Sequence, residues 1–99
     1  MKRHGESLER LQREIAAEKA AALGRAGERL EEALREEREL AAAVIRARGT
    51  ADAELVAREH AAARQRARQA RHALIIQREA LGLRHHAVVD QQFPEPRAP

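Results

Sequence analysis

Residues 44–56 read VIRARGTADAELV, and the turn at their centre, Gly49-Thr50, decides how this chain folds. Gly49 follows a stretch with helical periodicity that ends in Arg46 and Arg48, a pattern typical of a helix C-terminus. Thr50 is suited to cap a second helix, and Asp52 falls in its first turn, where an acidic side chain is favoured. The sequence therefore predicts a helix over 7–48, a turn at 49–50 and a second helix over 51–81.

The charges on the two sides of this turn have opposite signs. The acidic run before it comprises Glu28, Glu31, Glu32, Glu36, Glu37 and Glu39, and the basic run after it comprises Arg64, Arg66, Arg68, Arg71 and Arg78. Folding back at Gly49-Thr50 would set Glu28 opposite Arg71, Glu31 opposite Arg68 and Glu36 near Arg64. Exposed pairs contribute only about 0–1 kcal/mol each, so we expect them mainly to select the antiparallel arrangement. The same pairs could instead form between two chains.

The first predicted helix has one weak region. Its apolar residues recur every three or four positions after Ser7, a plausible N-cap, and Glu37 interrupts the series once. Gly24 and Gly27 each cost about 1 kcal/mol relative to alanine inside a helix. The helix is therefore either kinked at Gly24-Gly27, or continuous with small residues that let a neighbouring helix approach.

The second predicted helix carries a heptad seam made mostly of alanine, with His60 as a polar member. A polar residue in such a seam more often fixes the helix register than binds a metal. Gly82 should end this helix, with Leu83 folding back in a Schellman motif. The remaining residues, 83–99, form a C-terminal strap that is either helical or extended as far as Phe93 and then continues as a Pro-rich tail.

The predicted first helix is longer than the second by about ten residues, at about 1.5 Å each, so its N-terminal part extends beyond the pair. Leu8, Leu11 and Ile15 lie on this overhang. We expect the strap either to cover them or to serve as a contact for another chain. The strap residues expected to meet the overhang are Leu83, Val88, Val89 and Phe93.

Large apolar side chains are scarce, because the 99 residues include 23 alanines and Phe93 as the only aromatic. A chain of this size with so little to bury is marginally stable alone. We therefore predict one all-α domain over 1–99, an antiparallel helical hairpin that completes a coiled-coil bundle as a homodimer. The residues expected to contact the second copy or another partner are Leu8, Leu11, Ile15, Leu74, Ile75, Ile76, Leu83 and Phe93.

The sequence predicts no enzyme, cofactor or metal site. Ser7 and Thr50 are the only hydroxyl residues, there is no cysteine, and the histidines lack metal-ligand spacing. We therefore expect an interaction or structural module, which could also dock on a larger protein through residues 88–99. The alternative is nucleic-acid or anion binding through Arg64, Arg68, Arg71 and Arg78. The acids opposite this series and the lack of interleaved aromatics disfavour that alternative.

Neither a membrane span nor the apolar core of a secretory signal is visible, so we expect a cytoplasmic protein without membrane contact. The 17 arginines against 2 lysines, with many alanines, are typical of GC-rich bacterial genomes. The stretch LIIQREALGLRH at 74–85, followed by Phe93-Pro94, resembles short bacterial helical proteins that have no assigned activity. This resemblance implies no role for any particular residue.

Overall fold

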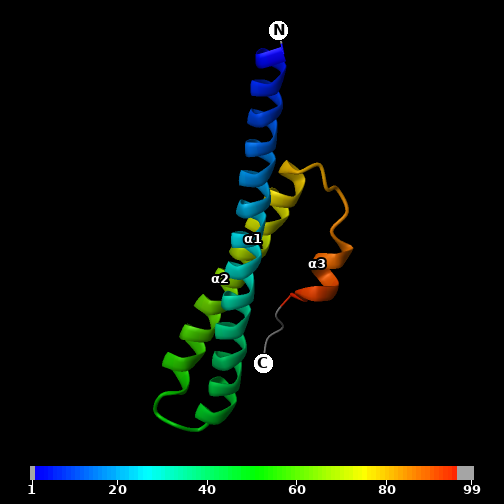
Figure 1. Cartoon of the computed structure of the whole chain (residues 1–99). Helices are drawn as coiled ribbons and strands as arrows, with labels where there is room; N and C mark the ends of the chain where they lie inside the picture. Colours follow the sequence, from blue (N-terminus) through cyan, green and yellow to red (C-terminus); the bar gives the residue numbers. More distant parts are fainter. Residues whose placement is uncertain (1, 96–99) are drawn as a thin grey trace.

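The structure is a computed structural model that describes residues 2–95, with side chains from residue 5 onward. Its elements are α1 (Lys2–Ala47), α2 (Ala53–Ala80) and α3 (Ala87–Gln92). Helices α1 and α2 pack antiparallel, and α3 lies beside them (Figure 1). The molecule is elongated, with extents of 75 × 22 × 14 Å. The predicted all-α antiparallel hairpin is confirmed.

Helix α1 is continuous through Gly24 and Gly27, so the kinked alternative is wrong. It also begins at Lys2, which places Ser7 inside the helix rather than at its N-cap. A Cβ atom added at either glycine would meet no atom within 4 Å. The small size of these two residues is therefore not needed for helix packing within one chain.

The turn between α1 and α2 is longer than the two residues expected, because α1 ends at Ala47 and α2 begins at Ala53. Gly49 has a φ of +78°, which glycine adopts without steric cost. The Thr50 hydroxyl donates a 2.6 Å hydrogen bond to the Ala47 carbonyl. Thr50 thus caps the end of α1, and the prediction that it caps the second helix is wrong. Asp52 occupies the N-cap position of α2 without a side-chain hydrogen bond.

The end of α2 is a Schellman motif, as predicted. The Gly82 N–H donates to the Glu79 carbonyl at 2.9 Å, and the Leu83 N–H donates to the Arg78 carbonyl at 3.0 Å. Gly82 has a φ of +83°, and the chain turns back along the hairpin after it (Figure 1). Residues 83–95, which we call the C-terminal segment, contain α3. Pro96 and Pro99 of the predicted tail lie outside the described residues.

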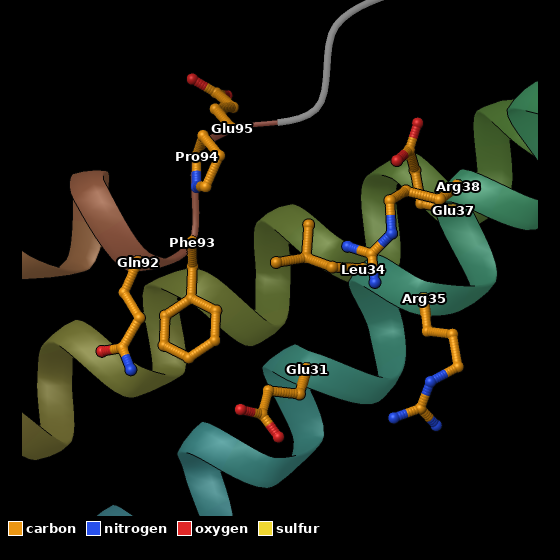
Figure 2. A pocket seen from close by; sticks show the side chains of 9 residues that line it. All are labelled: Glu31, Leu34, Arg35, Glu37, Arg38, Gln92, Phe93, Pro94 and Glu95. Atoms are coloured by element: carbon orange, nitrogen blue, oxygen red, sulfur yellow. The ribbon is translucent and has the colours of Figure 1, made fainter.

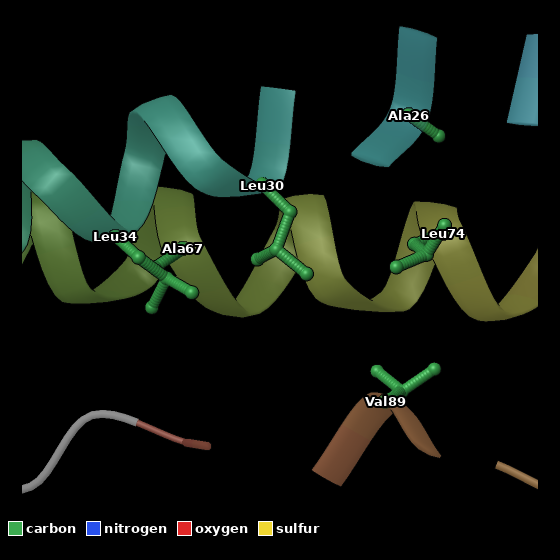
Figure 3. Close-up of a cluster of buried hydrophobic side chains, with 6 residues drawn as sticks. All are labelled: Ala26, Leu30, Leu34, Ala67, Leu74 and Val89. Carbon is green, nitrogen blue, oxygen red and sulfur yellow. The ribbon is translucent and has the colours of Figure 1, made fainter. Parts of the chain in front are cut away.

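The core lies where all three helices meet. Its buried apolar members are Ala26, Leu30 and Leu34 of α1, Ala67 and Leu74 of α2, and Val89 of α3 (Figure 3). Phe93 is half-buried and packs against this cluster. The C-terminal segment therefore covers the middle of the hairpin.

The N-terminal part of α1 is left uncovered. Residues 5–21 are exposed throughout, and the exposed fractions of Leu8, Leu11 and Ile15 are 51%, 51% and 42%. The expectation that the strap covers these residues is wrong, because the Schellman turn directs the C-terminal segment toward the hairpin turn instead (Figure 1). We call residues 5–21 the overhang.

Gly24→Ala and Gly27→Ala should each raise the free energy of unfolding by about 0.5–1 kcal/mol, because alanine favours the helix and has room at both sites. Urea unfolding followed by helical circular dichroism measures this change. Gly49→Ala is the matched control and should destabilise the fold because of its positive φ. A loss of stability in Gly24→Ala would contradict the open space at that position.

Candidate functional site

A buried polar pair joins the two long helices. The Nε2 atom of His60 lies 2.9 Å from Oε1 of Glu37, and the two side chains are 5% and 7% exposed. Both residues fall on the packing faces of α1 and α2, between apolar neighbours such as Leu34 and Ala63. Two polar side chains enclosed in this way satisfy each other and leave little solvent-accessible surface for a substrate. The geometry suits a structural contact between the helices.

The sequence indicates each member of this pair separately but does not show that the two are partners. Glu37 was an interruption of the first apolar series and His60 a polar member of the alanine seam. Folding the chain about residues 49–50 brings these two interruptions to nearly the same level. That coincidence is the signal that could have identified the pair.

One exposed ion pair joins the long helices, but the expected pairing of Glu36 with Arg64 is wrong, because Glu36 contacts Arg66 instead. Arg66 of α2 contacts Glu36 of α1 at 2.6 Å, with both side chains about half exposed. The expected pairs of Glu28 with Arg71 and of Glu31 with Arg68 are wrong. Those two arginines face the C-terminal segment instead.

Three arginines of α2 hold the C-terminal segment against the hairpin. Arg71 forms an ion pair and hydrogen bond with Asp90 of α3. Arg68 lies 3.5 Å from Glu95. Arg78 donates to the His85 carbonyl at 2.9 Å and to Nδ1 of His86 at 3.2 Å. Most of the arginine series that could have bound an external anion is thus engaged within the chain.

A cavity of about 530 Å³ remains beside the segment. Figure 2 shows Phe93 and Pro94 along one side and α1, with Leu34 and Arg35, along the other. Arg38 and Glu37 also line it, so the cavity reaches the buried polar pair. The C-terminal segment therefore fills only part of the space next to α1.

The eight predicted contact residues lie in three separate places. Leu8, Leu11 and Ile15 share the overhang, while Leu74 and Phe93 belong to the core or pack against it. Ile75 is half-buried, Ile76 is exposed, and Leu83 is exposed beyond the end of α2. The structure therefore does not bring the eight residues into one surface. Only the overhang group forms a continuous unpartnered apolar face.

No protein-family model, curated protein or solved structure matches this chain. Within residues 2–95, no helix has the length and apolar content needed to cross a membrane. In the same range, no three acidic or histidine side chains converge as a metal site would require.

Replacing one member of the buried pair should destabilise the fold much more than replacing both. Glu37→Leu or His60→Leu alone leaves a buried polar group without its partner and should cost about 2–4 kcal/mol. The double variant should recover to within about 1 kcal/mol of the original chain, because two apolar side chains can pack there. Urea unfolding at one fixed protein concentration gives these differences.

The exposed pair Glu36–Arg66 is the control for this experiment. Alanine at both positions should change the free energy of unfolding by less than about 1 kcal/mol. Single substitutions at Glu37 and His60 that cost no more than this control would show that the buried pair is not a strong constraint.

Proposed function

We propose that this chain is a non-enzymatic helical module that self-associates through its overhang. The observation that carries the proposal is the apolar face of Leu8, Leu11 and Ile15, which no other part of residues 5–95 covers. An apolar face of this kind on a helix is typical of a surface that packs on another helix.

This face is the continuation of the one that packs on α2. Ile15 precedes the buried Ala26 by eleven residues, about three helical turns, so their side chains leave α1 in nearly the same direction. Leu8 has a similar relation to Leu30, about six turns further on. The overhang therefore has a helix-packing face that α2 does not cover, because α2 ends before it reaches the level of Leu8 and Leu11.

A second copy of the same helix fits the space that α2 leaves. With Glu37 opposite His60, Ala80 of α2 lies level with about residue 17 of α1. A second α1 running antiparallel could continue beside the overhang from that level, with Leu8 of each copy opposite Leu11 of the other. In a heptad with Leu8 at a and Leu11 at d, a opposite d is the pairing that antiparallel helices use.

The charges of the overhang do not oppose this pairing. It carries four acidic side chains, Glu6, Glu9, Glu14 and Glu18, against three basic ones, Arg10, Arg13 and Lys19. The residues that flank the Leu8–Leu11 contact include the uncharged Ser7 and Gln12. The like-charge repulsion that would exclude a second copy is therefore small. Because the apolar face is short, we expect a concentration-dependent dimer.

The arginine contacts count against the alternative of nucleic-acid binding. Arg68, Arg71 and Arg78 would have to release the C-terminal segment before they could follow a phosphate backbone. Their acidic partners Asp90 and Glu95 also reduce the positive potential of this face. The overhang thus remains the better-supported functional surface.

Sedimentation equilibrium over a range of concentrations tests the proposal. The original chain should show a monomer–dimer equilibrium, and Leu8→Glu with Leu11→Glu should weaken dimerisation by about 100-fold or more, because unpaired charges would be buried. Neither substitution should lower the helical content, since both side chains are exposed within one chain.

Ile45→Glu with Leu55→Glu is the matched control, because these apolar residues are equally exposed but lie near the turn. This control should leave the equilibrium unchanged. A chain that stays monomeric at all concentrations, or a dimer lost only in the control, would contradict self-association through the overhang.

A further inference from the structure

The C-terminal segment packs on the hairpin through few side chains, as a short peptide ligand would. Only Val89 of this segment is buried, and Phe93 is half-buried four residues later. Val89 of α3 belongs to the core cluster together with Leu30 and Leu74, and Phe93, just past the end of α3, packs against that cluster. A six-residue helix such as α3 is not stable by itself, so its helical form depends on the surface beneath it.

The two ion pairs of the segment are weak contacts. Asp90 and Glu95 pair with Arg71 and Arg68, but the two acidic side chains remain 64% and 63% exposed. Exposed ion pairs add little to stability and are screened by salt. The segment is therefore held by the buried Val89, the half-buried His86 and Phe93, the hydrogen bonds from Arg78, and two ion pairs that salt weakens.

The C-terminal segment leaves part of the space beside α1 unfilled. The cavity of about 530 Å³ next to Phe93 is bordered on α1 by Glu31 and Glu37 as well as by Arg35 and Arg38. On α2, the Nε atoms of Arg64 and Arg71 are buried without a hydrogen-bond partner among the described residues. The unfilled volume would favour a larger ligand, and the preference for an acidic one comes from Arg68 and Arg71, which already face Glu95 and Asp90.

We infer that this surface of α1 and α2 binds an acidic amphipathic helix of another protein, and that the C-terminal segment is its built-in competitor. The bound helix carries an aliphatic and an aromatic residue four positions apart, as Val89 and Phe93 are, with acidic residues placed to meet Arg68 and Arg71. The chain's own segment is the template for this ligand chemistry. The inference does not rest on self-association through the overhang.

A second copy of the segment is a poorer occupant than a longer helix from another protein. Residues 83–86 form a short link between α2 and α3. The effective concentration of α3 at its own hairpin is therefore roughly in the millimolar range. A segment from a second copy has identical contacts and lacks this advantage. A longer ligand can displace the segment, because it also fills the cavity that the segment leaves open.

Peptide binding to the full chain tests the inference. The probe is a fluorescent peptide with the sequence of residues 83–95, and its control carries serine in place of Val89 and Phe93. In the full chain, Val89→Ser with Phe93→Ser releases the segment and should tighten binding of the probe by about tenfold or more, because the internal competitor is gone. The control peptide should not bind either chain.

Charge exchange tests the site of binding. In the released chain, Arg71→Asp should weaken binding of the probe several-fold, and a probe with Asp90→Arg should recover the lost affinity. If the released chain loses its helical signal, the full chain with Asp90→Asn is used in its place. This variant should bind the probe several-fold more tightly than the original chain does. Failure of both variants to bind the probe better than the original chain would overturn the inference.

Sedimentation separates this inference from the proposed dimer. Leu8→Glu with Leu11→Glu should leave probe binding unchanged, and Val89→Ser with Phe93→Ser should leave the dimer unchanged. If the substitutions in the segment dissociate the dimer instead, the surface takes the segment of a second copy. That result would also overturn the inference of another protein as partner.

Discussion

The structure depends on one contact, the buried hydrogen bond between Glu37 and His60. On the α2 side the seam around it consists largely of alanine, a small side chain that discriminates poorly among several offsets between α1 and α2. A buried carboxylate and imidazole satisfy each other at only one of these offsets and are costly at every other. The pair thus selects one register for the packing of α1 on α2. Fixing the register is the best-attested use of a buried polar group between helices.

The two surfaces for which we propose a function follow from this register. In this register α2 ends level with about residue 17 of α1, so no helix of residues 5–95 packs on the apolar face of the overhang. The same register also turns Arg68 and Arg71 toward the C-terminal segment, where they pair with Glu95 and Asp90. One face is open and apolar, whereas the other is basic and covered by the chain itself. We therefore propose two distinct modes of association for one short hairpin.

The sequence predicted the two long helices and the glycines that end them, because helical periodicity and glycine conformation act over a few residues, whereas the caps expected at Ser7 and Thr50 were wrong. Gly49 and Gly82 both adopt the positive φ expected of helix-ending glycines. The C-terminal segment was misplaced, because its direction depends on how the chain leaves Gly82 and on long-range contacts of Val89 and Phe93. The site was only partly foreseen for the same reason: the overhang leucines were evident, but the pairing of Glu37 with His60 requires the fold.

The most direct test of the account is the distance between spin labels at Arg29→Cys and Gln69→Cys, in labelled chains diluted with unlabelled ones. Both sites are exposed and the chain has no other cysteine. The account predicts one narrow distance below about 30 Å, which broadens when Glu37 and His60 are both leucine, as some molecules slip by a heptad of about 10 Å. A distance near 60 Å, expected of an unbroken rod at about 1.5 Å per residue, would contradict the hairpin. An equally narrow distribution in the leucine variant would contradict the role of the buried pair.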